Sequence, residues 1–400
     1  MITNTLFAPL PEQTRQLLEE IPALIDKTFP LPARFRSGLP KDVAELSRLL
    51  TSGRGERGLS YLGRPNLLSA YLRFFLPWNL YRLCRLLPGL DLKLAANDTV
   101  TDLGCGPMTF AAALWICRPD LRPLPLEFRC IDRSGPALEA GKKFFAELAG
   151  ENSPWNIHAI KSDLSAAKPA PAALVCAVNV FNEMHGDIAR IGGAAVHDDA
   201  VNRAAERSAR LLAAQNATAL SAIALSATTP YANPSAVLVV EPGIPRCGEF
   251  ISLLRSALAG RGYQPISPCP HGGECPFPGG ITRAGKQRWC HFAFETDDAP
   301  TALHRLSLAA RIPKERAVLS FLYAGVEDKD TPSQAELRVI SDAFPLPQNR
   351  LGRYCCSQQG LVLLAGERAA LEETVSGTLA SATINGRGRD PRSGALLAEL

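Results

Sequence analysis

Apolar residues recur at two different spacings along this chain of 400 residues, and the change in spacing divides it into regions. Through residues 1–95 they recur every three or four positions, which is typical of helices. Pro77 should kink or split the longest of these patterns, over residues 66–87. From residue 98 onward, short apolar runs alternate with helical patterns. We therefore predict an N-terminal helical region over residues 1–95 and an α/β domain over residues 96–263.

The α/β region contains five short apolar runs that we predict as strands. The run over residues 173–180 is almost entirely apolar, as expected for a central parallel strand covered on both faces. The predicted strands cover residues 99–103, 126–131, 157–161, 173–180 and 237–240. The predicted helices cover residues 110–116, 136–148, 199–214 and 250–258. This alternation predicts a doubly wound, Rossmann-like parallel sheet.

The chain beyond residue 263 is predicted in two parts. Residues 264–366 form a cysteine-rich segment and a small C-terminal subdomain, with a helix over residues 302–311 and a strand over residues 360–364. Residues 367–400 are predicted as a flexible tail, because they include a run of glycines and arginines.

Composition narrows the class of protein. An apolar fraction of 46% and a charged fraction of 20% are typical of a globular chain rather than a disordered one. No apolar run reaches the roughly 18–20 residues that cross a bilayer, and the first residues resemble neither a signal nor a transit peptide. We therefore predict a cytoplasmic protein without a membrane segment. Eleven cysteines, an odd number, argue against a disulfide framework in such a protein.

The net charge of +4 is spread unevenly. Residues 1–97 carry 13 Lys and Arg against 8 Asp and Glu, an excess of five positive charges. This excess is a modest indication of a polyanionic partner such as RNA, and a solvated helical surface explains it equally well.

The motif Asp-Leu-Gly-Cys-Gly-Pro at residues 102–107 lies between a predicted strand and a predicted helix. Gly104 and Gly106 let the backbone approach a ligand, and the following helix N-terminus supplies free N–H groups. Asp132 ends the next predicted strand, where a carboxylate can accept ribose hydroxyls. Asp163 ends the third, where a carboxylate can reach an adenine amino group.

Together with Asp102, two residues before the first glycine, this acidic set resembles the S-adenosylmethionine-dependent methyltransferases of the Rossmann-like class. A dinucleotide fingerprint would need a third glycine, and Met108 and Thr109 stand in its place. The resemblance implies S-adenosylmethionine as the cofactor and the following binding set: Asp102, Gly104, Gly106, Asp132 and Asp163. Catalytic residues stay open. Glu183 or His185, after the fourth strand, fits either a base or an ordinary polar loop residue.

Cys269, Cys275 and Cys290 lie in a segment rich in proline and glycine, and prolines flank the first two. Prolines restrict a loop and reduce the entropy lost when it binds a metal. A closed zinc or iron–sulfur site needs a fourth ligand. The candidates are Cys355, Cys356, Cys247, His271 and His291. The Cys-x5-Cys spacing fits neither zinc ribbons nor bacterial ferredoxins, so spacing leaves open both the metal and the alternative of separate buried thiols.

The cofactor motif and the cysteines occur together in a known family. The combination resembles the methyltransferase-like proteins of small ribosomal subunit assembly, whose mitochondrial members bind the maturing small subunit. The most specific part is the run Cys-Pro-His, Cys-Pro and Trp-Cys-His-Phe within residues 269–292. The resemblance covers roughly residues 35–366, and its other matching segments are residues 61–71, 102–107, 240–243 and 352–356.

The resemblance implies a four-iron, four-sulfur cluster on Cys269, Cys275, Cys290 and one residue of the 355/356 pair. We favour Cys356, because a small polar residue, Ser357, follows it directly as in the family. It also implies contact with the small ribosomal subunit and its RNA, with S-adenosylmethionine binding kept even where catalysis is lost. The alternatives are an active ribosomal RNA methyltransferase and a zinc-stabilised methyltransferase for a small molecule. The sequence does not indicate an oligomeric state.

Overall fold

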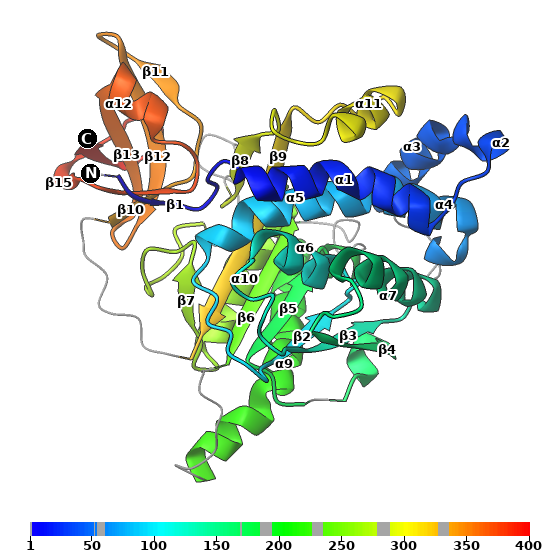
Figure 1. Ribbon diagram of the computed structural model, residues 1–400. Helices are drawn as coiled ribbons and strands as arrows, with labels where there is room; N and C mark the ends of the chain where they lie inside the picture. Colours follow the sequence, from blue (N-terminus) through cyan, green and yellow to red (C-terminus); the bar gives the residue numbers. More distant parts are fainter. Residues whose placement is uncertain are drawn as a thin grey trace.

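Two β-sheets and a layer of N-terminal helices make up the computed structural model of the chain (Figure 1). It describes residues 2–51, 53, 61–168, 170–184, 194–225, 235–277, 289–326 and 336–400. Among the helices described, none has the length and apolar character needed to span a membrane.

The central sheet has the strand order β4-β3-β2-β5-β6-β9-β7, and β8 pairs with β9. Its bounds are β2 (Thr99–Leu103), β3 (Glu127–Asp132), β4 (Asn156–Lys161), β5 (Leu174–Val178), β6 (Ala236–Pro242), β7 (Gln264–Ser267), β8 (Phe292–Glu295) and β9 (Arg316–Gly325). Strands β2 to β6 are parallel, and β9 is antiparallel to both β6 and β7. All five predicted strands are present, and the predicted Rossmann-like class I methyltransferase sheet is confirmed.

Helices cover both faces of this sheet because its strands are apolar on both sides. Side chains of a strand alternate between faces, and β5 shows the consequence. Leu174 and Cys176 join the apolar cluster under α6 (Thr109–Cys117) and α7 (Gly135–Ala149). Val175 and Ala177 join the opposite cluster, which packs against two further helices. These are α9 (Ala194–Leu225) and α10 (Pro245–Ala259).

The N-terminal helices lie over α6 and α7 (Figure 1). They are α1 (Glu12–Thr28), α2 (Ala33–Arg36), α3 (Leu39–Leu50), α4 (Pro65–Ala70) and α5 (Leu76–Leu86). The helical pattern over residues 66–87 is interrupted, as predicted. A π-helical turn over Tyr71–Phe75 separates α4 from α5, and Pro77 is the second residue of α5.

Short elements complete the connections. Two brief helices are α8 (Phe181–Met184) and α11 (Thr301–Ala309), and single 3-10 turns cover Tyr61–Gly63, Leu87–Gly89 and Leu164–Ala166. The segment between β7 and β9 carries three of the cysteines as well as β8 and α11. It is therefore a long insertion between the last two paired strands of the central sheet.

The second sheet has the order β1-β14-β10-β12-β13-β16-β15, and β11 pairs with β12. Its bounds are β1 (Ile2–Thr5), β10 (Glu336–Val339), β11 (Phe344–Leu346), β12 (Arg350–Ser357), β13 (Gly360–Glu367), β14 (Thr378–Ser381), β15 (Thr383–Arg389) and β16 (Leu396–Glu399), with α12 (Arg368–Glu373) beside β12 and β13. The first residues, predicted as part of a helical region, thus form a strand that pairs with β14.

The predicted flexible tail over residues 367–400 is corrected by the structure, which places α12, β14, β15 and β16 there. Leu396 and Ala398 of β16 are buried in the core of the second sheet with Val362 and Leu364 of β13. The glycine- and arginine-rich run is part of β15, at the edge of the sheet. A polar edge strand has few apolar positions, so composition alone made it look unstructured.

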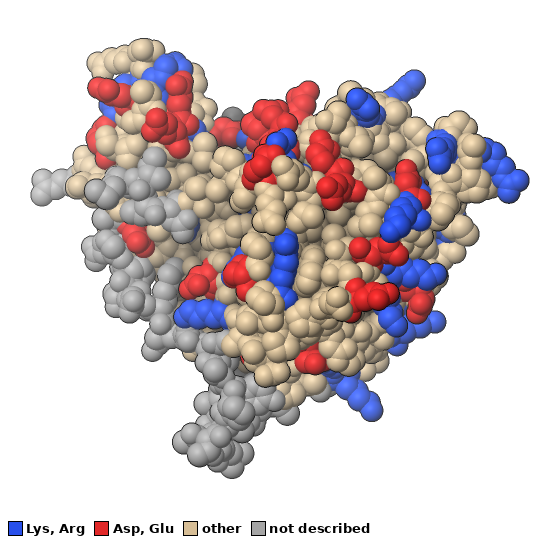
Figure 2. Space-filling model, viewed as in Figure 1, with Lys and Arg blue, Asp and Glu red and all other residues tan. Residues whose placement is uncertain are grey.

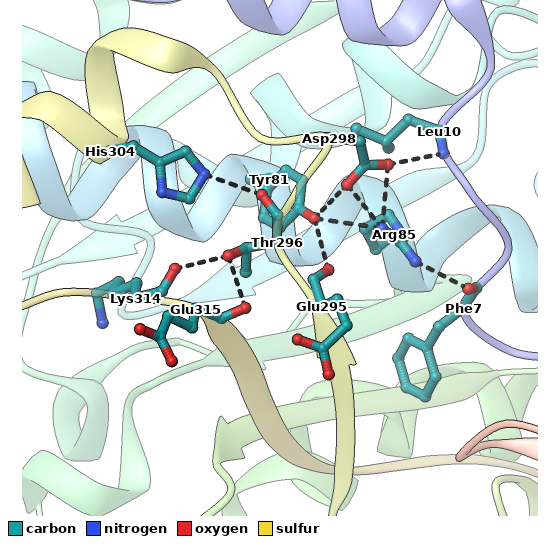
Figure 3. Close-up of polar contacts among 10 residues, drawn as sticks. All are labelled: Phe7, Leu10, Tyr81, Arg85, Glu295, Thr296, Asp298, His304, Lys314 and Glu315. Carbon is teal, nitrogen blue, oxygen red and sulfur yellow. Dashed lines mark hydrogen bonds and ion pairs between the residues drawn. The ribbon is translucent and has the colours of Figure 1, made fainter.

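A buried polar network joins the N-terminal layer to the insertion (Figure 3). Arg85 of α5 donates to both carboxylate oxygens of Asp298, at 2.8 and 3.1 Å, and Tyr81 Oη donates to Asp298 Oδ1 at 2.5 Å. Arg85 also donates to the Phe7 carbonyl, and Asp298 Oδ2 accepts from the Leu10 backbone N–H. The Arg85 side chain is 9% exposed, so its charge depends on Asp298 for compensation.

Candidate functional site

A cavity opens beyond the carboxyl ends of β2, β3 and β5, where ligands of open α/β sheets bind. Four of the five predicted cofactor residues line it, namely Gly104, Gly106, Asp132 and Asp163. The opposite wall comes from the N-terminal region, through Tyr61, Leu62 and Tyr71, and from the segment after β5, which includes Asn179 and Glu183. We refer to this cavity as the cofactor pocket.

The two glycines of the turn are required by its geometry. Gly104 and Gly106 have φ angles of +67° and +53°, a region that residues with a Cβ rarely adopt. A Cβ added at Gly104 would lie 2.6 Å from Val180 Cγ2, closer than carbon atoms can approach. A side chain at this position would therefore displace the wall of the cofactor pocket.

Asp132 is held in place by the same turn. Its Oδ2 accepts from the Gly106 backbone N–H at 2.9 Å, and its Oδ1 accepts from the Ser134 backbone N–H at 2.7 Å. Each carboxylate oxygen has two lone pairs, so both oxygens can accept a further hydrogen bond from a ligand. The carboxylate is thus oriented before any ligand arrives.

Asp102 lies beneath the turn rather than in the wall of the cofactor pocket. It is 1% exposed and borders a small adjacent cavity with Tyr71, Asn79 and Asn179. Its Oδ2 is buried and has no hydrogen-bond partner among the residues that the structure describes. Burial raises the pKa of Asp102 to about 7. An unsatisfied carboxylate oxygen in this place suits a ligand that carries a positive charge or an N–H donor.

Asp163 lies at an exposed edge of the cofactor pocket, at the end of β4. Its Oδ1 accepts from the backbone N–H and the hydroxyl of Ser165, at 2.9 and 2.6 Å. These two bonds lower the pKa of Asp163 and keep its carboxylate charged. The carboxylate can therefore accept a hydrogen bond from a ligand at this end.

Tyr71 and Asn179 are pocket residues that the sequence reasoning missed. Tyr71 comes from the π-helical turn, a feature frequent at functional sites, and it borders the cofactor pocket and two adjoining cavities. Asn179 has a φ of +58° directly after β5. The interrupted helix around Pro77 was the available signal for Tyr71. His185, considered above as a base, lies outside the described residues, and Glu183 lines the pocket.

Glu241, at the end of β6, holds the segment after β5 in position. It is fully buried, and its carboxylate accepts from the Phe181 backbone N–H at 2.8 Å. It also accepts from the backbone N–H and the side-chain amide of Asn182, at 3.2 and 2.7 Å. Burial raises the pKa of Glu241 to about 7. The residue that follows Asn182 is Glu183, so this carboxylate fixes one wall of the cofactor pocket.

The four predicted cysteine ligands come from distant parts of the chain. Cys269 follows β7, Cys290 precedes β8, and Cys356 lies on β12 of the second sheet. Cys275 and Cys290 pack against the apolar cluster that contains Cys356. Burial, and then the neighbouring thiols of Cys269, Cys290 and Cys275, raise the pKa of Cys356 well above its usual value. The structure thus brings all four side chains into one neighbourhood, which we call the cysteine site.

The second sheet separates Cys356 from Cys355. Side chains alternate along β12, and Cys355 is fully buried in the core of the second sheet with Leu337 and Val362. Cys356 points the other way, where the His271 ring nitrogen Nε2 lies 3.4 Å from its sulfur. Burial raises the pKa of Cys355 to about 12, without a contribution from the other cysteines. Cys356 is therefore the member of the pair that lies beside the insertion.

The other candidate ligands differ in their surroundings. Cys247 is buried on α10, where the groups that influence its pKa are Glu241 and Arg246 rather than the other cysteines. The His291 ring stacks on Trp289, and its Nδ1 lies 3.2 Å from the Trp289 carbonyl oxygen. His271 remains beside the cysteine site through its contact with Cys356.

Two buried arginines flank the cysteine site. Arg255 donates to the carbonyls of His271 and Gly273, at 2.9 and 2.5 Å, and Arg338 donates to the Pro268 carbonyl at 2.9 Å. Their exposed fractions are 5% and 6%, and neither forms an ion pair within the described ranges. Burial lowers the pKa of Arg338 to about 10, and nearby cysteines oppose that shift. Two buried positive charges therefore face the four thiols.

Beneath the glycine turn, three buried residues of the described chain place their metal-binding atoms close together. The ligand atoms of Asp102, Cys105 and Cys130 lie within 4.8 Å of one another, and all three residues are buried beneath the glycine turn. No three residues of the cysteine site satisfy this limit.

The fold and the cofactor pocket define a methyltransferase-like protein. Within the chain, residues 224–361 match the sequence model of a family described as "Mitochondrial small ribosomal subunit Rsm22". This segment runs from before β6 to β13 and includes the whole cysteine site. The match confirms, over that segment, the family resemblance predicted from the sequence.

Solved structures similar to this chain include several methyltransferases. One is the methyltransferase chain in a complex with the Trm112 activator of Haloferax volcanii, with 13% identity over 63% of this chain and 90% of that one, and a TM-score of 0.30. Another is magnesium protoporphyrin IX methyltransferase from Synechocystis with bound SAH, with 9% identity over 72% and 99% of the two chains and a TM-score of 0.32. No curated protein sequence matches the chain.

Proposed function

We propose that this protein is an S-adenosylmethionine-binding, methyltransferase-like factor that acts in small ribosomal subunit assembly and carries a cysteine-ligated four-iron, four-sulfur cluster. One observation carries the proposal. The segment that matches the small-subunit family contains all four cysteines, and the fold gathers them although Cys356 lies on a different sheet. Cytoplasmic localisation stays a prediction, because the family description is mitochondrial.

The cofactor pocket supports binding of S-adenosylmethionine through the nature of its polar groups. Asp132 offers two oriented acceptor oxygens for a ribose diol, and Asp163 offers a charged acceptor at one end. The free oxygen of Asp102 suits the amino group of the methionine part. When bound, S-adenosylmethionine supplies an electrophilic methyl group. The residues of this chain orient the cofactor and, through Tyr71 and Glu183, form the wall next to it.

The cysteine site fits an anionic metal centre. A buried guanidinium without a counter-ion costs several kcal/mol, and Arg255 and Arg338 both lack an ion-pair partner in the described ranges. Four ligating thiolates with a four-iron, four-sulfur core would carry a net negative charge next to these two cations. The arginines also hold the loop backbone at Pro268, His271 and Gly273, so the same residues shape the site and balance its charge.

The donor set of the cysteine site fits either a cluster or a single zinc ion. Four thiolates can hold one zinc ion in a tetrahedron, or they can bind the irons of a four-iron, four-sulfur cluster. We favour the cluster because the family resemblance implies it, and metal analysis separates the two.

Metal analysis of protein purified without oxygen tests this proposal. We expect about four irons and four acid-labile sulfides per chain, with a broad absorption band near ~400 nm. Zinc at one per chain with no iron would instead support the zinc-stabilised methyltransferase. Absence of both metals would remove the cluster from the proposal.

Sedimentation tests the ribosomal part separately. We expect the wild-type protein to co-sediment with immature small subunits, and Cys275→Ala to lose this association because the insertion is no longer fixed. Cys117→Ala, a buried cysteine of α6, serves as a matched control and should sediment like the wild type. Normal association of a folded Cys275→Ala protein would contradict the proposed link between cluster and subunit.

An active ribosomal RNA methyltransferase is the second candidate, because a further cavity adjoins the cofactor pocket where a methyl acceptor would lie. This function predicts a methylated nucleotide in small-subunit RNA that disappears when the gene is deleted. Identical methylation in the deletion strain and its parent would count against this candidate and favour a binding role alone.

A further inference from the structure

The cavity next to the cofactor pocket shares Tyr71, Asn179 and Glu183 with it. We call this neighbouring cavity the acceptor cavity. Its remaining walls come from the end of α3, from α5, from the segment after β6, and from the insertion and the start of β9. It therefore lies at the carboxyl edge of the central sheet, and a ligand held there would be adjacent to the cofactor.

Two positively charged side chains in the acceptor cavity, Arg82 and Lys314, have no ion-pair partner among the residues that the structure describes. Arg82 donates to the side-chain oxygens of Asn79 and Asn179, both at 3.0 Å, and its Nε is buried without a hydrogen-bond partner in the described chain. The ammonium of Lys314 lies 5.9 and 6.0 Å from the ring centroids of Phe74 and Trp78. No hydrogen bond or ion pair to it occurs within the described ranges.

These two cations also lie close enough to repel each other. Burial first, and then the charge of Arg82, lower the pKa of Lys314 to about 8. Burial lowers the pKa of Arg82, and Glu241 opposes this shift. Both side chains are partly buried, and a pair of like charges in such a wall is more favourable when an anion compensates them. The acceptor cavity is thus electrostatically suited to a negatively charged ligand.

Two carboxylates, Glu241 and Glu183, lie near the acceptor cavity, and they differ in how they are held. Glu241 is occupied by its three bonds to Phe181 and Asn182. Glu183 lines the cavity, and its charge raises the pKa values of Tyr71 and Glu241, whereas it does not contribute to the pKa shifts of Arg82 and Lys314. Arg316, a third cation in the wall, pairs with Glu295 and Asp342.

The position of Lys314 is fixed by its backbone (Figure 3). The Thr296 hydroxyl donates to the Lys314 carbonyl at 2.6 Å and to the Glu315 carbonyl at 2.9 Å. The Thr296 carbonyl in turn contacts the His304 ring nitrogen Nε2 at 2.9 Å. The loop that carries Lys314 is therefore held by the insertion, and little ordering remains to be done when a ligand binds.

Aromatic rings stand beside the cations. Tyr71 and Phe75 line the acceptor cavity and stack on each other with ring centroids 5.8 Å apart, and Trp78 contributes a third ring. Cations next to aromatic rings are the combination by which proteins hold single-stranded nucleic acid, with phosphate on the charge and bases on the rings. A small carboxylate ligand would use the cations and leave the rings without a role.

We propose that the acceptor cavity binds one nucleotide of single-stranded RNA, with its phosphate between Arg82 and Lys314 and its base against Tyr71 and Phe75. This proposal rests on the proposed function, and it specifies that a single-stranded nucleotide of the RNA lies next to the cofactor pocket. Overall surface charge is a weaker guide. In Figure 2 basic and acidic side chains are mixed over the visible face, although α2 carries two exposed arginines, Arg34 and Arg36.

Binding of a fluorescein-labelled, unstructured decaribonucleotide to the full chain, followed by anisotropy over a salt series, tests the proposal. Lys314→Met keeps the aliphatic stem against Phe74 and Trp78 and removes the charge. We expect affinity to fall about tenfold and the salt dependence to lose about one counter-ion. Lys314→Arg should restore binding to within about threefold, since it restores the charge. Lys143→Met, at an exposed position on α7, should bind like the wild type.

Unchanged RNA binding by Lys314→Met, or equal loss in Lys143→Met, would overturn the proposal. A wild-type protein that does not bind the oligonucleotide would also overturn it, whereas metal content and co-sedimentation would still test the proposed function independently. Competition with AMP and with inorganic phosphate shows which part of the nucleotide the cavity recognises. Displacement by AMP at lower concentration than by inorganic phosphate supports contact with the base, and equal potency of the two contradicts the nucleotide. S-adenosylmethionine affinity should be unchanged in Lys314→Met, because this residue does not line the cofactor pocket.

Discussion

The cofactor pocket and the cysteine site are assembled in opposite ways. The pocket residues Gly104, Gly106, Asp132 and Asp163 follow three neighbouring strands of one sheet, and each lies just past or at a strand end. The cysteine site joins an insertion of the central sheet to Cys356 on the second sheet. The pocket thus depends on local strand–turn–helix geometry, whereas the cysteine site depends on how two sheets dock.

Because the two sites are built differently, we expect substitutions in them to affect different properties of the protein. Damage at the cysteine site should loosen the second sheet and leave the central sheet able to bind its cofactor. Damage in the pocket should remove cofactor binding and leave metal content unchanged. The two sites are therefore separable by single substitutions, although one chain carries both.

The largest expected effect is a loss of iron when Cys356, but not the adjacent Cys355 of β12, is replaced. Cys356→Ser should lose most of the iron and the absorption near ~400 nm, because one of four ligands is gone. Cys355→Ser is the matched control: it changes a buried thiol in the core of the second sheet and should keep its iron. Iron and sulfide content, measured on both proteins purified without oxygen, gives the answer. The reverse result would assign the ligand to Cys355.

Asp132→Ala should weaken S-adenosylmethionine binding about 100-fold, because two charge-assisted hydrogen bonds to the ribose are lost. Asp163→Ala should cost about tenfold or less, since its carboxylate is exposed to water. Titration calorimetry measures the S-adenosylmethionine affinity of both variants, and the metal content of both should match that of the wild type. Loss of iron in Asp132→Ala would contradict the independence of the two sites.

Asp298→Ala should lower the free energy of unfolding by about 2–3 kcal/mol, because it leaves the buried guanidinium of Arg85 without its partner. Glu147→Ala removes an exposed ion pair with Lys27, whose side chains are 42% and 73% exposed, and should cost less than about 0.5 kcal/mol. Denaturant unfolding of both proteins provides the measurement. Equal effects would show that the network of Figure 3 does not hold the insertion.

The smallest expected effect concerns pH. Asp102 has a folded-state pKa of about 7, above its ordinary value of 3.8, so the folded protein holds a proton that the unfolded chain has released between these pH values. The contribution of Asp102 to stability is therefore present below pH 4 and is lost as pH rises toward 7. Asp102→Asn removes this loss and should raise stability at pH 8, on the order of 1–2 kcal/mol more than at pH 5, in the absence of cofactor. An equal change at both pH values would show that Asp102 is already charged when folded.

Much of the cofactor pocket could be predicted because its signals are local. The strand before Gly104, the two glycines and the acids at successive strand ends each depend on neighbouring residues. Tyr71 could not be identified in this way. It belongs to a π-helical turn, and the sequence of that turn does not indicate which strand ends it will face. The pairing of Arg82 with Lys314 could not be predicted for a related reason: the two residues meet only when α5 and the loop before β9 pack together.

The tail and the first strand show the same limit. Ile2–Thr5 and residues 367–400 belong to one sheet, and each pairs with a segment far away in sequence. A strand gains its hydrogen bonds and its buried face only from its neighbours, so its own residues are an uncertain guide. The prediction of the fourth candidate ligand was limited in the same way, since Cys355 and Cys356 differ only in which face of β12 they occupy.

The sequence by itself determined the Rossmann-like sheet, the glycine turn with its acids and the cysteines that are candidate metal ligands, because apolar periodicity and short motifs are properties of neighbouring residues. Only the tertiary structure decided that Cys356 rather than Cys355 faces the insertion and that two arginines flank the cysteine site. It alone brought Arg82 and Lys314 together beside the cofactor pocket. These features depend on contacts between segments distant in sequence, and packing of the two sheets and the helical layer creates those contacts.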